Sequence, residues 1–152
     1  MKEFNSKMDK KFSIVMALLL LAFQLVSIVS MPATVVAAVN KDVEVKIELV
    51  GNSTGIIQKG ELFEVEATVT NKTGETINDI SLNINRVDGL IPTGENWTID
   101  VADKLENNES ISKRITFHYN GTDSAITLSM HTVFNRDGKR ETSEYTSKIY
   151  GI

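Results

Sequence analysis

The stretch that decides the fold is Phe63-Glu64-Val65-Glu66-Ala67-Thr68-Val69-Thr70, in which apolar and polar side chains alternate. Successive side chains of a β-strand point to opposite faces of a sheet, so the pattern predicts a strand with one buried and one solvent-exposed face. Val and Thr also favour strands. No stretch after residue 38 has an apolar period of 3.6 residues, which argues against helices.

The same alternation recurs on both sides of this stretch. Turn-forming residues separate the runs, and Asn120-Gly121 and Asp137-Gly138 are the clearest of them because both dipeptides tolerate the positive φ angles of tight turns. The last run is more polar, with Tyr145 and Ile149 on one face, and is predicted to be an edge strand. The predicted strands lie within residues 43–49, 63–70, 80–84, 97–101, 111–119, 126–134 and 141–150.

About seven half-buried strands predict an all-β fold, an immunoglobulin-like two-sheet β-sandwich with antiparallel strands. A small β-barrel is the alternative. The chain has no cysteine, which excludes the immunoglobulin disulfide, a cysteine-based zinc site and a cysteine nucleophile. Trp97 does not lie on the third predicted strand, where antibody domains have their core tryptophan. The fold is therefore immunoglobulin-like without being an antibody-type domain.

Residues 1–38 have the order of a secretory signal peptide. Four lysines precede ten consecutive apolar residues at 14–23, and Val36-Ala37-Ala38 puts small residues where signal peptidase cleaves. Cleavage is predicted after Ala38, with Ala37 as the next choice, so residues 1–38 are the signal peptide and residues 39–152 the domain. The alternative is an uncleaved anchor, because residues 12–31 approach the roughly 20 residues that span a bilayer.

The charge balance limits the classes of partner that the chain is expected to bind. The chain has 16 Lys and Arg against 20 Asp and Glu, a formal net charge of −4. With no basic excess to neutralise phosphates, no nucleic-acid partner is expected. The expected location is secreted or on the extracellular cell surface, with membrane contact through the N-terminal segment only if that segment stays uncleaved.

Two stretches resemble a known family. Gly60-Glu61-Leu62-Phe63-Glu64-Val65-Glu66-Ala67-Thr68-Val69-Thr70-Asn71-Lys72-Thr73-Gly74 is similar to a stretch of the CARDB-type and S-layer-associated Ig-like domains of bacterial and archaeal surface proteins. Leu105-Glu106-Asn107-Asn108-Glu109-Ser110 resembles their turn before a strand, with Asn108 where glycine is usual. The resemblance implies a surface Ig-like domain, in which Gly60 and Gly74 serve turns. It assigns no ligand.

The titratable residues indicate no catalytic, cofactor or metal site. His118 and His131 fall on the solvent-facing parity of strands expected in different sheets, and zinc needs three or four converging ligands. Glu64 and Glu66 share one face, which is typical of a solvated strand rather than of a catalytic carboxylate pair. The chain is therefore predicted not to be an enzyme.

Three aromatic residues are candidates for stacking on a ligand: Trp97, Tyr119 and Tyr145. For Trp97 a place in the core is the favoured interpretation. The most apolar predicted loop, residues 87–92, is either a contact patch or a further strand. Five Asn-x-Ser/Thr triplets fall in or beside predicted loops, at Asn52, Asn71, Asn96, Asn108 and Asn120.

The sequence therefore favours a secreted or cell-surface, non-catalytic Ig-like module for adhesion, envelope structure or partner binding. A surface protein or a cell-wall glycan is the expected partner, and the polar last strand is open to strand addition. The alternatives are a carbohydrate-binding accessory module and a membrane-anchored ectodomain with an uncleaved N-terminal helix.

Overall fold

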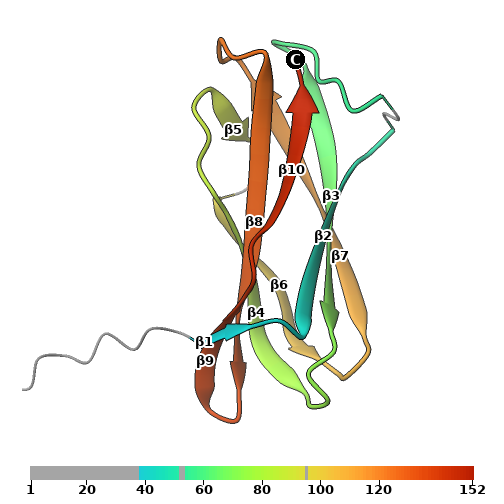
Figure 1. Ribbon diagram of the computed structural model, residues 1–152, viewed down its shortest axis with the longest axis vertical. Helices are drawn as coiled ribbons and strands as arrows, with labels where there is room; N and C mark the ends of the chain where they lie inside the picture. The colour runs from blue at the N-terminus through green and yellow to red at the C-terminus, as the bar shows by residue number, and fades with distance from the viewer. Residues whose placement is uncertain (1–37, 52–53, 95) are drawn as a thin grey trace, which may run out of the picture. The chain divides into compact units, whose positions relative to one another are not determined.

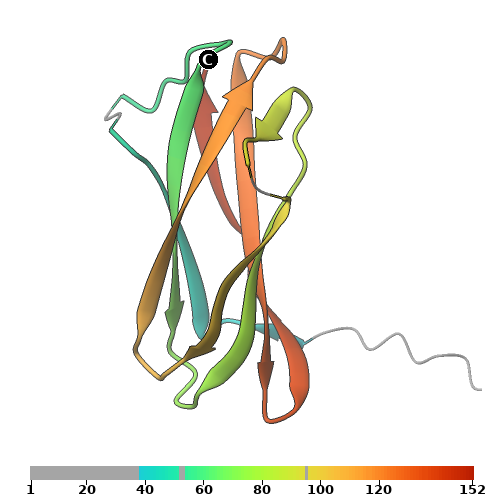
Figure 2. The same cartoon turned by 180° about the vertical axis from the view of Figure 1, so that it is seen from behind.

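The computed structural model describes residues 38–51, 54–94 and 96–152, and these form an all-β domain (Figures 1 and 2). Residues 1–37, which hold most of the predicted signal peptide, lie outside the described residues. No helix in the described part is long and apolar enough to cross a bilayer. The strands are β1 (Ala38–Asn40), β2 (Val43–Leu49), β3 (Leu62–Asn71), β4 (Ile77–Ile84), β5 (Leu90–Pro92), β6 (Thr98–Leu105), β7 (Ser110–Tyr119), β8 (Ala125–Arg136), β9 (Lys139–Ser143) and β10 (Thr146–Gly151).

Two sheets pack face to face. The six-stranded sheet has the order β1-β9-β8-β4-β6, and β10 also pairs with β8, on the side away from β4. The four-stranded sheet has the order β2-β3-β7-β5. Within these sheets every strand pair is antiparallel except β1 with β9, which is parallel. The predicted immunoglobulin-like two-sheet β-sandwich is confirmed.

The strands number ten in the described residues rather than about seven. The run predicted at 141–150 divides into β9 and β10, because the chain leaves the ladder at Glu144 and Tyr145 before it pairs again with β8. Residues 90–92 form the short strand β5, so part of the most apolar predicted loop is a strand. β1 and β5 have three residues each, too few for an alternation to reveal them.

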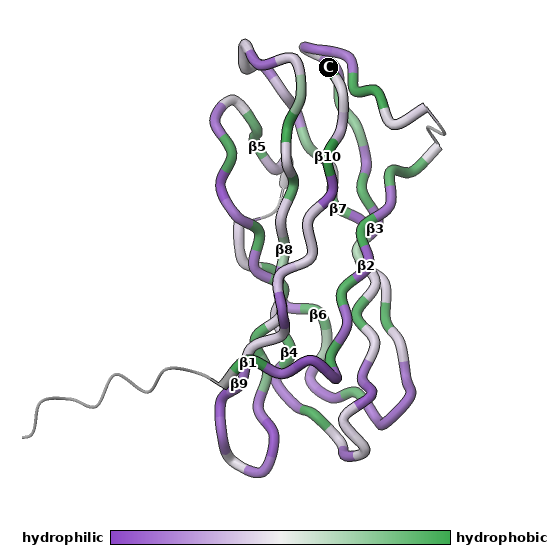
Figure 3. Tube along the Cα trace, in the orientation of Figure 1, coloured by the Kyte–Doolittle hydropathy of each residue, from purple (hydrophilic) through white to green (hydrophobic). Residues whose placement is uncertain are grey.

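The core lies between the sheets and contains the side chains that alternation assigns to the buried face. Val65, Ala67 and Val69 of β3 are at most 1% exposed, and hydropathy alternates along the strands in Figure 3. At the end of the chain Tyr145 and Ile149, which are predicted to share one face of an edge strand, are both exposed, and Tyr150 enters the core. The largest buried aromatic side chains are Phe117, Tyr119, Phe134 and Tyr150.

The turns of the resembling stretches have the backbone geometry that glycine favours. Gly60 and Gly74 have φ angles of 82° and 83°. Asn108, which stands where the family usually has glycine, has a φ of 63°. Asparagine tolerates this left-handed conformation better than most residues, which explains why it can replace glycine here.

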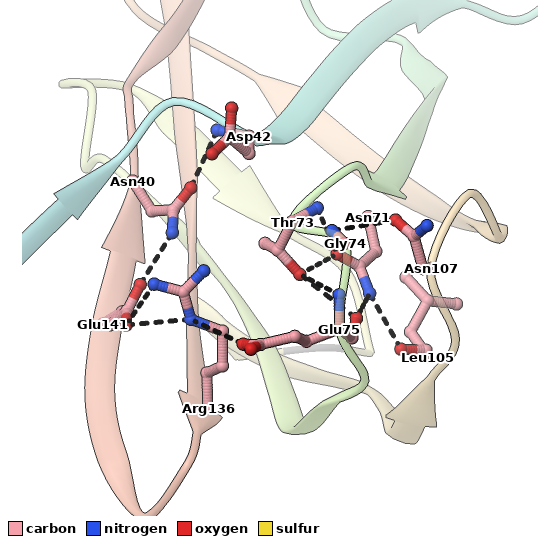
Figure 4. A network of polar contacts seen from close by, with 10 residues as sticks. All are labelled: Asn40, Asp42, Asn71, Thr73, Gly74, Glu75, Leu105, Asn107, Arg136 and Glu141. Carbon is pink, nitrogen blue, oxygen red and sulfur yellow. Dashed lines mark hydrogen bonds and ion pairs between the residues drawn. The ribbon is translucent and has the colours of Figure 1, made fainter.

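Asn71 ties the end of β3 to the ends of β4 and β6 (Figure 4). Its side chain is fully buried, and its amide nitrogen donates to the carbonyl oxygens of Glu75 at 2.8 Å and Leu105 at 3.0 Å. Its amide oxygen accepts from the main-chain nitrogen of Thr73 at 3.0 Å and from the Thr73 hydroxyl at 2.8 Å. Because buried polar groups need partners, this one side chain satisfies several groups at the base of the sandwich.

Replacing Asn71 with alanine is expected to lower the free energy of unfolding by about 2–4 kcal/mol, because it leaves buried donors and acceptors unpaired. Urea titration followed by tryptophan fluorescence measures the change. Asn120→Ala, at an exposed turn, is the matched control and should change the stability by less than about 0.5 kcal/mol. Equal effects of the two variants would contradict the structural role of Asn71.

Candidate functional site

The three candidate stacking residues do not form one site. Trp97 is partly buried against the core, and the Arg86 guanidinium lies 5.8 Å from the centroid of its ring. This agrees with the core interpretation of Trp97. Tyr145 is 61% exposed and lies between β9 and β10, whereas Trp97 precedes β6 at the opposite edge of the same sheet. The strands β8 and β4 separate them.

Tyr119 has no surface to offer a ligand. Its side chain is 0% exposed, and its hydroxyl accepts a hydrogen bond from the main-chain nitrogen of Asp123 at 3.1 Å. The ring packs so closely on Gly121 that a Cβ added there would lie 2.4 Å from the Tyr119 hydroxyl. Tyr119 is a core residue, and its prediction as a stacking residue is wrong.

The histidines lie in different sheets, as the immunoglobulin-like topology predicts: His118 on β7 and His131 on β8. A ring nitrogen of His118 lies 3.2 Å from the carbonyl oxygen of Gly60. The ring of His131 lies against Tyr145, with 4.3 Å between the centroids, and its Nδ1 is buried without a hydrogen-bond partner. The described residues contain no group of three or more His, Cys, Asp or Glu side chains placed to hold a metal ion.

Four of the five Asn-x-Ser/Thr triplets lie in the described residues. Asn71 cannot carry a glycan in the folded domain, because its amide nitrogen is buried and donates to two carbonyl groups. Asn96, Asn108 and Asn120 are exposed. Asn52 lies outside the described residues.

Exposed apolar side chains gather along one edge of the six-stranded sheet. Val39 pairs in register with Thr142 of β9, Tyr145 and Ile149 follow along the same edge, and Ile56 forms a bridge with Gly151 at its far end. Strand alternation places Val39 and Ile149 on the outer face of this sheet. Tyr145 lies against His131 of β8, and Ile56 lies beside Gly151. We call Val39, Ile56, Tyr145 and Ile149 the edge stripe; they are 63%, 54%, 61% and 69% exposed.

Two further exposed apolar residues lie on the other sheet. Leu62 of β3 and Ile91 of β5 both pair in register with His118 of β7 and are 62% and 50% exposed. They make a shorter row than the edge stripe and lie away from any open strand end of the six-stranded sheet. They therefore serve as a natural comparison for the edge stripe.

The edge of β10 faces the edge of β2 across a seam between the sheets. The hydroxyl of Thr146 donates to the carbonyl oxygen of Val45 at 2.7 Å and crosses this seam. On one side of that bond a groove of about 380 Å³ is lined by residues that include Lys41, Val43 and Tyr145. On the other side a groove of about 340 Å³ is lined by residues that include Glu48, Lys148 and Tyr150.

Tyr150 lines the groove that also contains Glu48 and Lys148. Its side chain is 2% exposed, and its hydroxyl has no hydrogen-bond partner. Burial, and secondarily the negative charge of Glu48, raises the pKa of this hydroxyl, so it stays protonated at neutral pH.

A buried polar network holds β1 against β9 next to the edge stripe (Figure 4). The amide nitrogen of Asn40 donates to Glu141 at 2.7 Å, and Arg136 donates to the other oxygen of the same carboxylate at 2.9 Å. Asn40 and Glu141 are 8% and 7% exposed. Because a buried charge needs such partners, the network fixes the position of β1 at this edge.

Sequence reasoning missed both this network and the gathering of the edge stripe. Asn40 stands beside the predicted cleavage site, and nothing in the sequence indicates that it meets Glu141, a hundred residues later. The sequence predicts that Tyr145 and Ile149 share one face of an edge strand, and the structure adds Val39 and Ile56 to them. Those two come from a three-residue strand and a loop, which have no periodicity to read.

No protein-family model and no curated protein sequence matches the chain. The fold is similar to that of AvmM, which catalyses macrocyclization in alchivemycin A biosynthesis, with a TM-score of 0.53 at 10% identity over 75% of this chain and 90% of AvmM. It is also similar to the GAE domain of GGA2p from Saccharomyces cerevisiae, with a TM-score of 0.50 at 9% identity over 75% and 94% of the two chains. At such identities the likeness concerns the fold alone, and the resemblance to CARDB-type and S-layer-associated domains stays a prediction.

His131 should make the stability of the domain sensitive to mild acid. Burial lowers its pKa below the usual 6.5, so the unfolded chain takes up this proton more readily than the folded one, and the free energy of unfolding falls as the pH drops below 6.5. His131→Gln removes this contribution. Urea unfolding of both proteins between pH 7.5 and 5.5 is expected to give a smaller loss for the variant. Parallel stability curves would contradict the assignment.

Proposed function

We propose that this chain is an exported, non-catalytic immunoglobulin-like module that binds a partner protein outside the cell. The edge stripe is the observation that carries the proposal. Its four apolar side chains are each more than half exposed and lie along a single sheet edge. A gathered apolar patch with polar surroundings is typical of protein–protein contact sites, whereas single exposed apolar residues need no explanation.

The chemistry of the edge stripe favours a protein over a glycan. Sugars bind by stacking on flat aromatic faces, and of the three candidate stacking residues only Tyr145 is well exposed. The other members of the stripe, Val39, Ile56 and Ile149, are aliphatic. Aliphatic side chains beside an open strand edge suit the side chains and main chain of another protein.

Export rests on the sequence of residues 1–38. Cleavage after Ala38 would remove the first residue of β1 and leave Val39 and Asn40 in the mature chain. Asn40 would still reach Glu141, and Val39 would remain part of the edge stripe. The proposed processing and the proposed binding surface are therefore compatible.

The export proposal predicts a defined mass. Producing cells are separated into medium, wall and membrane fractions, and the intact mass of the protein is taken from each. A chain that starts at Val39, found in the medium or wall, is the expected result. A full-length chain confined to the membrane fraction would make the N-terminal segment an anchor and the domain an ectodomain.

The binding proposal predicts that the edge stripe controls attachment to cells. The protein purified from its producing cells is labelled, and its binding to those cells is titrated. Ile149→Ser is expected to weaken binding about tenfold, as loss of a well-packed apolar contact does. Leu62→Ser, at a similarly exposed residue of the other sheet, is the matched control and should bind as the wild type does.

Protease treatment of the cells separates the two classes of partner. If trypsin abolishes binding, the partner is a protein. If binding survives trypsin and Ile149→Ser has no effect, the edge stripe is not the contact surface and the carbohydrate-binding alternative replaces the proposal.

A further inference from the structure

We infer that the edge of β10 takes up an extended segment of the partner protein as an additional β-strand, paired with Ser147 and Ile149, and that this segment carries a carboxylate beside Lys148. The inference rests on the proposed function and names its partner by chemistry. Its support comes from the main chain of β10, from the charges along the seam and from what β10 would meet in a second copy of itself.

In β10 the main-chain N–H and C=O groups of the odd-numbered residues point away from β8. At Gly151 the nitrogen donates to Gly55 at 3.1 Å and the carbonyl oxygen accepts from Ile57 at 2.8 Å, both on the outer side. The next residue, Ile152, donates to Ser124 at 2.9 Å on the β8 side. Since outward and inward residues alternate along a strand, Ser147 and Ile149 also direct their N–H and C=O groups outward.

These outward groups have no main-chain partner among the described residues. The chain covers the two ends of this edge itself, with β1 beside β9 (Figure 1) and with the bridge between Ile56 and Gly151. Both covering segments run parallel to the strand they meet. Between them a short stretch around Ser147 and Ile149 presents two unpaired N–H and two unpaired C=O groups, which is the requirement for strand addition.

An added strand would meet different side chains on its two faces. On the outer face it would lie beside Tyr145 and Ile149, which favours apolar side chains on that side. On the seam face it would lie beside Lys148, which borders the groove between β10 and β2. The side chain opposite Lys148 would therefore face the opposite way from its two neighbours, giving an apolar–acidic–apolar pattern.

The positive charge of Lys148 favours an acidic side chain at the partner residue opposite it. The other lysines along the seam have partners, Lys41 with Glu144 at 3.5 Å and Lys46 with Glu48 at 2.8 Å. Lys148 is exposed and forms no ion pair with any described residue, although Glu48 lines the same groove. A carboxylate opposite Lys148 supplies the missing countercharge, as opposite-charge pairs across neighbouring strands do.

The same lysine argues against a second copy of this chain as the occupant. Antiparallel pairing of two β10 strands through Ser147 and Ile149 would place Lys148 directly opposite Lys148 of the other copy. Like charges directly opposite each other on neighbouring strands are destabilising, and lysine on edge strands is a common protection against self-pairing. The occupant that fits is therefore a different chain.

The test uses a fluorescein-labelled peptide, Ser-Thr-Val-Glu-Val-Thr-Ser, and the same peptide with lysine in place of glutamate. Binding to the protein purified from its producing cells is measured by fluorescence anisotropy. The acidic peptide is expected to bind at least about tenfold more tightly than the basic one. In Lys148→Glu the preference should reverse, and since Lys148 is exposed this variant leaves the core intact.

The main-chain part of the inference is tested with proline. Ile149→Pro removes an outward N–H without touching the ladder to β8, so the domain should fold and lose peptide binding. The matched control is Ile149→Ala, which loses the apolar contact but keeps the N–H, so it should bind both peptides more weakly and still prefer the acidic peptide. Hydrogen exchange supplies a readout independent of folding, because the acidic peptide should protect the amides of Ser147 and Ile149 in the unaltered protein.

The inference is overturned if the acidic peptide does not bind at 1 mM, a concentration on the order of weak peptide affinities, if Lys148→Glu leaves the preference unchanged, or if neither amide becomes protected. These failures differ from failure of the proposed function. A protein that binds cells through Ile149 but ignores both peptides keeps the proposed function and loses strand addition.

Discussion

Burial of one face of each strand against the opposite sheet is the interaction on which the rest of this domain depends. The described residues contain no disulfide, so side chains such as Val65, Val69 and Leu82, all fully buried, hold the two sheets together. Each such side chain contributes about 1.5–3 kcal/mol when it is buried. A slip of one residue in β3 would turn Glu64 and Glu66 into the core, so the register is strongly fixed. With the register fixed, the residues of the outer faces and edges are fixed too.

A two-sheet sandwich has unpaired strand edges, and in this domain some parts of the edge are covered and others are open. At β9 the edge is covered by β1, which the buried contacts among Asn40, Glu141 and Arg136 hold in place. At the far end Ile56 and Ile57 cover Gly151. Between β1 and β2 the chain crosses to the other sheet, where β2 pairs with β3 and so does not cover the edge of β10. The open stretch of β10 thus follows from the crossing of the chain between the sheets after β1.

Much of the fold could be predicted from the sequence because its signal is local. Alternation in residues 43–49 and 63–70 identifies β2 and β3 nearly to their ends. The burial of Tyr119 could also be predicted, because Tyr119 lies on the same face of its strand as Ile115 and Phe117.

The candidate site was harder to predict because it depends on irregularities. In β9 the odd residues Glu141 and Ser143 are buried, whereas in β10 the even residue Tyr150 is buried. The irregular step at Glu144 and Tyr145 reverses the parity, and no residue type there announces it. The edge stripe also needs Val39 and Ile56, whose places depend on long-range pairing. Position in the fold, rather than composition, makes these residues one surface.

In the proposed strand addition, affinity and selectivity come from different groups of the β10 edge. Apolar contact with Tyr145 and Ile149 is non-directional, so it would reward almost any apolar partner. Main-chain pairing at Ser147 and Ile149 sets the register of an added strand but does not distinguish one sequence from another. Selection among partners then falls to Lys148, whose charge disfavours a second β10 and favours an acidic side chain. An apolar strand edge without a charged residue would tend to aggregate. Lys148 opposes such self-pairing and also gives the edge its preference for an acidic segment.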